Sequence, residues 1–328
     1  MINTLYCKNF KCYLSTEIDF QQFTVISGKN SSGKSTIIQA ILLYYASLNS
    51  NKVNLHNIFN LNLVGQKELV CNKQMDEDFF EISINSNAFT YKELVLNERS
   101  VLNNISLVEK QPDFDDHSII YLGADRTLSS HQIESIHGDG YVPTPTNSFL
   151  ADYVFINDNA LKSDTIRNKI SDCLIKLGFV SQSFEVIKGG RNYQLKIDNT
   201  DIEHVGVGIK YTIPILLSVI SNQNSVIIIE NPEIHIHPSA QVTLMLLLLQ
   251  ISKENNNQLI IETHSDHILN ALRVGIKSEL VEYQNSQILF VNEDSEVNSI
   301  DIDSKGRLGE RHDGFFDEIE KQLKVLLW

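Results

Sequence analysis

The chain has 328 residues, of which 42% are hydrophobic and 21% charged, and its formal net charge is −14 at pH 7. This size and composition predict a soluble protein with a large core, and no apolar run is long enough to cross a bilayer. The acidic excess disfavours direct binding of nucleic acid unless a local basic patch, a dimer groove or a partner protein supplies positive charge.

The first residues and the cysteines indicate a cytoplasmic protein. Residues 1–4 lack the basic region and apolar core of a signal peptide. The cysteines at 7, 12, 71 and 173 have no C-x-x-C spacing, which is typical of free thiols in a reducing compartment.

The N-terminal segment predicts paired strands that lead into a phosphate-binding loop. Residues 2–26 alternate as paired strands do, with Phe10, Tyr13 and Phe20 as core anchors. The apolar run 23–26 is followed by GKNSSGKS and then by apolar residues at helical spacing over 36–47. In this G-x-x-x-x-G-K-S pattern, backbone N–H groups converge on an anion at the N-terminus of a helix.

This loop predicts a bound nucleoside triphosphate. Lys34 is expected to reach the β- and γ-phosphates, and the Ser35 hydroxyl is expected to bind Mg²⁺. The predicted phosphate-binding residues are Gly28, Lys29, Asn30, Ser31, Ser32, Gly33, Lys34, Ser35 and Thr36.

The middle of the chain predicts connections, hairpins and short helices. In chain order we expect an exposed connection over 48–64, a hairpin over 79–96 turning at 85–87, a short buried strand over 118–122, a long irregular loop over 128–146, two helices within 147–177 and a second hairpin over 184–197 turning at 188–191.

The C-terminal part alternates buried strands with apolar helices. Strands are expected over 226–229, 259–261, 288–291 and 297–302. Helices are expected over 209–220 and 238–253, after the strand 259–261 through 273, and over 315–327. No heptad pattern persists over three or four heptads, so no coiled coil is predicted.

Polar side chains follow two of these strands. Glu230 comes directly after four apolar residues, where a carboxylate can complement Mg²⁺ or a metal-bound water. His264 follows the next strand and could contact a γ-phosphate or its attacking water. The carboxyl ends of parallel strands meet at one sheet edge, so these residues are expected to converge on the phosphate. Glu233, His235 and His237 lie in a Pro-bracketed segment that predicts a tight turn rather than a zinc site.

Six ordered motifs resemble the ABC-type ATPase heads of the SMC and overcoming-lysogenization-defect class, in particular the compact AAA-type subfamily found in bacterial antiphage defence. They are the opening strands with the phosphate loop (1–36), YLGADR (121–126), VGVGIKYTIPIL (205–216), NPEIHIHP (231–238), THS (263–265) and GRLGERHDGFFDEI (306–319).

The resemblance implies a mixed α/β ABC/SMC-type P-loop ATPase head with an antiparallel β lobe, a short helical and hairpin lid and no coiled-coil arm. It implies a single head over 1–328, made of a β lobe with Walker A (1–47), an insertion (48–204) and a segment with the signature, Walker B, switch histidine and C-terminal helix (205–328). Two heads would dimerise head to tail around two ATP molecules. Gly206, Gly208 and Lys210 of one head would then contact the ATP of the other.

Three positions depart from the usual pattern. Asn231 stands after Glu230 where many relatives have a glutamate, and an amide cannot accept a proton from water, so Glu230 and Glu233 remain the alternatives for the general base. Lys210 replaces the usual signature serine. The Gln loop has no clear counterpart, and Gln66 is the candidate for that metal-side position.

The leading functional interpretation is a Mg²⁺-dependent ATPase that acts as a sensor or scaffold for a separate effector, such as a nuclease or toxin, in an antiphage or DNA-maintenance module. Its contact with nucleic acid is expected to be indirect. The alternative is a DNA-repair head that binds duplex ends itself, for which Lys188, Arg191 and Lys196 are the basic cluster that the sequence offers. A transporter motor is disfavoured because the signature lacks L-S-G-G-Q, and no membrane partner is expected.

Overall fold

The structure is a computed structural model with two compact units. Unit 1 comprises Met1–Asp116 and Glu282–Trp328, and unit 2 comprises His117–Val281. The residues that the structure describes are 1–48, 52–54, 69, 71, 79–93, 104–110, 119–126, 164–180, 184–189, 192–309, 315 and 318–327. Among them, no helix has the length and apolar character that a membrane crossing needs.

Unit 1 contains an antiparallel sheet with the strand order β2-β1-β5-β6-β7-β4. Its strands are β1 (Thr4–Phe10), β2 (Tyr13–Asp19), β4 (Lys52–Asn54), β5 (Phe79–Ile84), β6 (Asn87–Glu93) and β7 (Asn104–Lys110). The predicted hairpin over 79–96 is present as β5 and β6, and it turns through Asn85 and Ser86, both with positive φ. A two-residue turn of this conformation matches the twist of the paired strands.

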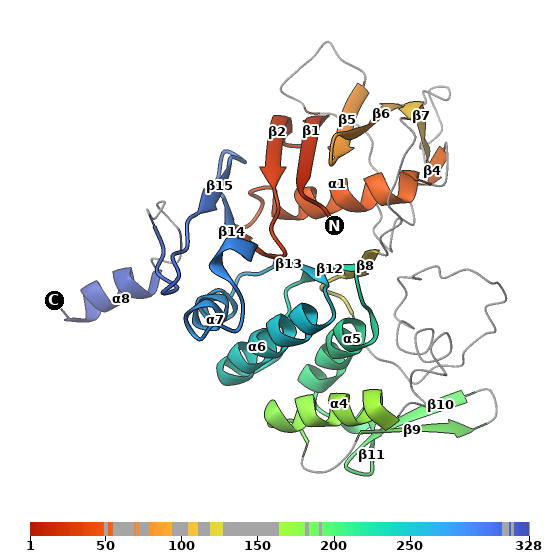
Figure 1. Ribbon diagram of the computed structural model, residues 1–328, viewed down its shortest axis with the longest axis vertical. Coiled ribbons are helices and arrows are strands. Elements are labelled where there is room, and N and C mark those ends of the chain that lie inside the picture. Colours follow the sequence, from red (N-terminus) through yellow and green to blue (C-terminus); the bar gives the residue numbers. More distant parts are fainter. Residues whose placement is uncertain are drawn as a thin grey trace. The chain divides into compact units, whose positions relative to one another are not determined.

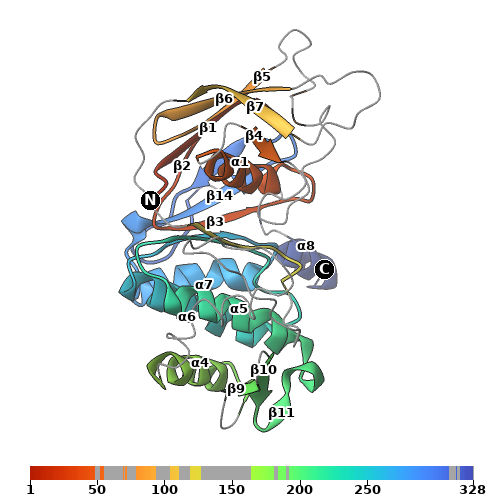
Figure 2. The same ribbon diagram turned by 90° about the vertical axis from the view of Figure 1, so that its right-hand side faces the viewer.

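A second group of strands in unit 1 leads to the phosphate loop. β3 (Phe23–Gly28) runs parallel to β14 (Ser286–Val291), which pairs with β15 (Val297–Ile300) in antiparallel fashion. Helix α1 (Lys34–Ser47) lies between this group and the antiparallel sheet (Figure 2). It buries residues on several of its faces, as a helix covered on both sides must. The unit also holds η3 (Tyr283–Asn285) and α8 (Glu318–Leu327).

Unit 2 is built on three parallel strands, β13 (Gln258–Glu262), β12 (Val226–Glu230) and β8 (Ile119–Leu122), in that order. These strands are almost wholly apolar because a parallel sheet is covered on both faces. Helices α5 (Val207–Ser221), α6 (Pro238–Glu254) and α7 (Asp266–Lys277) lie on one side of them (Figure 1).

A smaller group of elements in unit 2 surrounds the start of α5. Helix α4 (Asp164–Lys176) packs against α5, and β9 (Phe184–Gly189), β10 (Asn192–Ile197) and β11 (Thr200–Asp201) form a small antiparallel sheet that leads through η2 (Ile202–His204) into α5. The strands of the predicted second hairpin are therefore present.

The structure confirms the predicted mixed α/β class with an antiparallel β lobe. Within the described ranges the longest helix is α6, with 17 residues, so no coiled-coil arm occurs there. All four cysteines are free thiols. Strand β4 lies inside the segment expected to be a plain connection, and β7 had no predicted counterpart. The predicted loop over 128–146 and the first of the two helices within 147–177 lie outside the described residues. The three-segment division of the head stays a prediction.

Candidate nucleotide-binding site

Two glycines of the phosphate loop adopt conformations that other residues rarely take. Gly28 has φ of 148° and Gly33 has φ of 113°. A Cβ atom on Gly28 would lie 2.2 Å from the carbonyl oxygen of Val291, and one on Gly33 would lie 2.8 Å from Cys12 Sγ. Both the backbone conformation and the lack of space therefore require glycine at these positions.

The loop is fixed through the carbonyl oxygen of Gly33. This oxygen accepts hydrogen bonds from the Tyr13 hydroxyl at 3.0 Å and from the backbone N–H groups of Thr36 at 3.0 Å and Ile37 at 3.3 Å. The antiparallel sheet and the first turn of α1 thus hold the same atom. This arrangement keeps the N-terminus of α1 at the end of the loop, where its positive potential can attract an anion.

The interior of the loop holds the Lys34 ammonium. Lys34 is 3% exposed, and its Nζ donates to the carbonyl oxygens of Gly28 at 3.0 Å and Lys29 at 2.6 Å. The Ser32 hydroxyl is also buried, and it has no hydrogen-bond partner among the residues that the structure describes. A buried hydroxyl without a partner is unfavourable, so this loop fits a ligand rich in acceptor oxygens, such as a phosphate chain.

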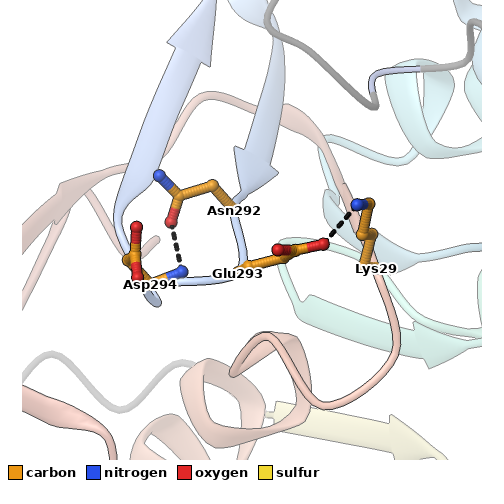
Figure 3. Close-up of polar contacts among 4 residues, drawn as sticks. All are labelled: Lys29, Asn292, Glu293 and Asp294. Carbon is orange, nitrogen blue, oxygen red and sulfur yellow. Dashed lines mark hydrogen bonds and ion pairs between the residues drawn. The ribbon is translucent and has the colours of Figure 1, made fainter.

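The rim of the loop carries an ion pair with the turn between β14 and β15. Lys29 pairs with Glu293 of this turn (Figure 3). The turn is held by Asn292 Oδ1, which accepts from the backbone N–H groups of Asp294 at 3.0 Å and Glu296 at 2.8 Å. The hydrogen bond from Lys29 lowers the pKa of the Glu293 carboxyl. Both side chains are more than half exposed, so the pair itself contributes little stability, but it partly neutralises the cation at the rim.

Unit 2 places two carboxylates next to each other at the ends of its strands. Glu230 and Glu262 are in-register neighbours on the parallel strands β12 and β13, so their side chains leave the sheet on the same face. Burial and, to a smaller extent, the charge of Glu262 raise the pKa of Glu230 to about 7, although hydrogen bonds with the Tyr121 hydroxyl and the Ala124 backbone oppose the rise. Glu262 was not among the predicted site residues, although it too directly follows an apolar run.

The residue after Glu230 begins a tight turn. Asn231 has φ of 45°, in the left-handed region, where asparagine is tolerated better than most residues. Its N–H donates to the carbonyl oxygen of Glu262 at 2.8 Å, and its carbonyl oxygen accepts from Ile234 N at 3.3 Å. This conformation gives a physical reason for an asparagine at this position.

Glu233 joins this turn to His264, the predicted switch histidine. One of its carboxylate oxygens accepts from the Thr263 hydroxyl at 2.8 Å, and the other accepts from the backbone N–H of His264 at 2.9 Å. Two predicted site residues from different segments, Glu233 and His264, are thus brought together. In the described structure the Glu233 carboxylate already uses both oxygens to hold the residues after β13.

The two histidines of the turn have structural partners. His237 is the N-cap of α6, and its Nδ1 accepts from Ser239 N at 3.3 Å. The His235 ring packs edge-on against Tyr211, with ring centroids 5.1 Å apart. The described residues contain no group of three or more histidine, cysteine and acidic side chains that could hold a metal ion. The predicted tight turn is therefore present.

The start of α5 carries the predicted signature residues. Gly206 is the N-cap of α5, and a Cβ there would meet no atom within 4 Å. A Cβ on Gly208 would lie 2.5 Å from the His235 carbonyl oxygen, so Gly208 allows α5 to approach the turn closely. Lys210 lies in the first turn of α5. The contact of these residues with a partner's ATP stays a prediction, and Gln66 lies outside the described residues.

Arg126 is a residue whose role the sequence analysis did not recognise. It is 7% exposed and donates hydrogen bonds to backbone carbonyls at the ends of β8 and β12 and in α5. Its presence in the YLGADR motif was the available signal.

Gly28 to Thr36 belong to unit 1, whereas the carboxylates, His264 and the predicted signature residues belong to unit 2. That the two sets meet around one nucleotide stays a prediction.

Comparison with known proteins now identifies the family. The family described as "AAA domain, putative AbiEii toxin, Type IV TA system" matches residues 23–270, about three quarters of the chain. The chain belongs to this AAA domain family. Residues 281–326 of this AAA domain protein match a second family, described as "Protein of unknown function (DUF3696)". No curated protein sequence matches the chain.

Solved structures show which fold this AAA domain protein has. It resembles an Smc head bound to the C-winged helix domain of ScpA, with 16% identity, a TM-score of 0.54 and coverage of 92% of this chain and 98% of that chain. It also resembles the Smc head domain with an extended coiled coil from Pyrococcus furiosus, bound to the C-terminal domain of ScpA, with 14% identity, a TM-score of 0.52 and coverage of 99% and 98%. The predicted ABC/SMC-type P-loop ATPase head fold is thereby confirmed.

Proposed function

We propose that this AAA domain protein binds and slowly hydrolyses ATP with Mg²⁺, and that it acts as a nucleotide-controlled scaffold for a separate effector. The observation that carries the proposal is the phosphate loop. Its two glycines have positive φ, the Lys34 ammonium lies inside it, and the buried Ser32 hydroxyl has no partner in the described part of the chain. A triphosphate would supply acceptors for both groups.

The site residues would divide the chemistry as follows. Ser35 and Glu230 would hold Mg²⁺, which when bound would neutralise negative charge on the phosphates. Lys34 binds phosphate oxygens, and Glu233 holds the backbone of His264 so that its side chain keeps one position beside the phosphate. Asn231 cannot accept a proton, Glu230 would hold Mg²⁺, and both oxygens of Glu233 already accept hydrogen bonds, so neither of the two predicted candidates for the general base is free for that role alone. We therefore expect slow turnover.

We expect dimerisation because the phosphate loop of one copy and the N-terminus of α5 of another copy would contact the same ATP. The N-terminus of α5 presents Gly206 to open space, and its backbone amides could approach the γ-phosphate of an ATP bound by a second copy. ATP would then favour the dimer because both copies contact the γ-phosphate, and its hydrolysis would favour separation.

The role beside an effector draws on the family and on the Smc heads. The family description names a toxin and a toxin–antitoxin system, which supports a function in antiphage defence or in maintenance of DNA. The two Smc heads are each bound to a domain of ScpA, a different protein. For this chain, a partner polypeptide that senses the dimeric state is the corresponding proposal.

The proposal is tested by measuring ATP affinity and molar mass together. Equilibrium dialysis should detect ATP binding by the wild type and none by Lys34→Ala. Light scattering should detect a dimer only when ATP and Mg²⁺ are present. Equal affinity of both proteins would contradict the assignment of the loop, and a monomer saturated with ATP would contradict the dimer.

The alternative is a head that binds duplex DNA ends directly. Lys196 lies on β10, whereas Arg191 and the side chain of Lys188 lie outside the description. Filter binding to duplex DNA across a salt series separates the two functions. Direct phosphate contacts would make affinity fall steeply with salt concentration, whereas the scaffold predicts weak binding at all concentrations.

A further inference from the structure

Arg126 holds three segments of unit 2 through their backbone carbonyls. Its Nη1 donates to Gly123 O at 3.0 Å and to Glu230 O at 2.5 Å, and its Nη2 donates to Asn231 O at 2.8 Å. Its Nε donates to Tyr211 O of α5 at 3.1 Å. These acceptors belong to the end of β8, the end of β12 with its following turn, and the second turn of α5.

The chemistry of this contact requires a guanidinium group. Arginine presents five N–H donors in a fixed planar fork, so it can bond four carbonyl oxygens that surround it at the same time. Lysine has a single nitrogen and cannot reach all four. Burial lowers the pKa of the Arg126 guanidinium to about 10, and the charges of Glu233 and Glu230 oppose this fall, so the group stays protonated at neutral pH. A buried cation that bonds only neutral backbone groups is costly to keep, which suggests a purpose beyond packing.

Contacts around Tyr211 extend the connection along α5. The Arg126 guanidinium lies 5.8 Å from the centre of the Tyr211 ring, and that ring packs against His235 of the turn after β12. Gly208, one turn earlier in α5, faces the His235 carbonyl oxygen so closely that no side chain fits between them. The first two turns of α5 are therefore packed against the turn 231–237.

The same turn is connected on its other side to the switch histidine. Glu233 accepts from the Thr263 hydroxyl and from the backbone N–H of His264, and Asn231 N donates to Glu262 O. An unbroken series of hydrogen bonds and ring contacts thus leads from α5 through Arg126 and the turn to His264. It lies wholly within unit 2.

We propose that Arg126 is a positioning residue that makes α5, the turn 231–237 and the switch histidine move as one body. The face of α5 predicted to contact a second copy's ATP would then be coupled to the carboxylates and histidine predicted to act on the chain's own ATP. The coupling between two ATP sites rests on the proposed function. The joining of the segments by Arg126 does not, because it follows from contacts inside one unit.

The test compares Arg126→Gln with Arg273→Gln, which changes an arginine on α7 that donates a hydrogen bond to Asn270 Oδ1. Hydrogen exchange of the nucleotide-free protein should accelerate in Arg126→Gln over both 207–212 and 231–237, and should stay at the wild-type rate over 238–254. Arg273→Gln should leave all three segments unchanged. Faster exchange at only one of the two segments would overturn the proposal.

Kinetics supply the second measurement. In Arg126→Gln the KM for ATP should stay within about threefold of the wild type, because the phosphate loop is intact, whereas kcat should fall about 10²-fold, as expected when catalytic groups are misplaced by about 1 Å. Equal losses from Arg126→Gln and Arg273→Gln would contradict a positioning role. Absence of turnover in the wild type would refute the proposed ATPase function but not the joining of the segments, which the exchange experiment tests alone.

A third variant keeps the proposal testable if Arg126→Gln does not fold. If circular dichroism finds that Arg126→Gln is unfolded, Arg126→Lys takes its place, because it keeps the charge but replaces the planar fork of five donors with a single nitrogen. It should again accelerate exchange at 207–212 and 231–237 together. Wild-type exchange at both segments in Arg126→Lys would show that the charge, and not the four-way hydrogen bonding, joins the segments, and would overturn the proposal.

Discussion

Substitutions of Glu233 decide whether this residue acts as the general base or only holds His264 in position. Its two oxygens accept hydrogen bonds of 2.8 and 2.9 Å from the Thr263 hydroxyl and the His264 N–H. In Glu233→Gln the amide oxygen can still accept from His264 N, while the bond with Thr263 must reverse, with the amide nitrogen donating to the Thr263 hydroxyl. The variant loses the charge assistance of these bonds and the acceptor of the Thr263 hydroxyl proton, about 0.5–1.5 kcal/mol of stability.

Glu233→Ala removes both acceptors. The His264 N–H loses its partner, while the Thr263 hydroxyl keeps one, since it accepts from Ser265 N at 3.0 Å. Each group left without a partner costs roughly 1–3 kcal/mol if water does not replace it. Because His264 would then lose its fixed position, we expect kcat to fall about 10²-fold in Glu233→Ala. In Glu233→Gln we expect a fall of less than about tenfold, which corresponds to 1.4 kcal/mol.

The assay is phosphate release at saturating ATP, with thermal denaturation of each variant to measure stability. Glu254→Gln, an exposed carboxylate on α6 that pairs with Gln250, is the matched control. A general base behaves differently, because glutamine cannot accept the proton. If Glu233→Gln loses as much kcat as Glu233→Ala while it keeps wild-type stability, Glu233 is the general base, and the inference that it only holds His264 in position is refuted.

Three further outcomes are expected. Lys34→Ala should abolish ATP binding in equilibrium dialysis, because its ammonium lies inside the loop. The raised pKa of Glu230, about 7 against a usual 4.5, means that its contribution to stability is complete below about pH 4.5 and lost as pH rises through 7. The free energy of unfolding of Glu230→Gln, relative to that of the wild type, should therefore rise by up to about 3 kcal/mol from pH 5 to pH 9, as measured by chemical denaturation. An equal difference between the two proteins at both pH values would contradict this. Gly208→Ala should lower the melting temperature, since its Cβ would lie 2.5 Å from His235 O, and an unchanged melting temperature would mean that the turn can move away.

Much of the fold was predictable because its signals are local. The apolar runs of β3, β12 and β13 are strong strand signals, and the glycines of the phosphate loop and the Asn-Ser turn of the β5–β6 hairpin have few alternative conformations. Strand β7 was missed because its place is set by pairing with β6, in a register that shifts between Thr90 and Tyr91. Such a contact depends on the rest of the sheet and leaves little local trace.

The candidate site was predictable in its composition but not in its contacts. The positions of Glu230, Glu233 and His264 at strand ends follow from the pattern of apolar runs. The pairing of Glu230 with Glu262 required the register of β12 and β13, which no single segment contains. The role of Arg126 required knowledge of which carbonyls face it, and these come from segments up to 105 residues away.

The left-handed backbone of Asn231 has an evolutionary consequence. A mutation to glutamate there would place a longer side chain on a backbone with φ of 45°, a conformation that glutamate rarely adopts. A carboxylate at position 231 could therefore act as a general base only if the backbone of the turn also changed its conformation. For the proposed ATPase, the tight turn therefore restricts the changes at position 231 that could raise the rate of ATP hydrolysis.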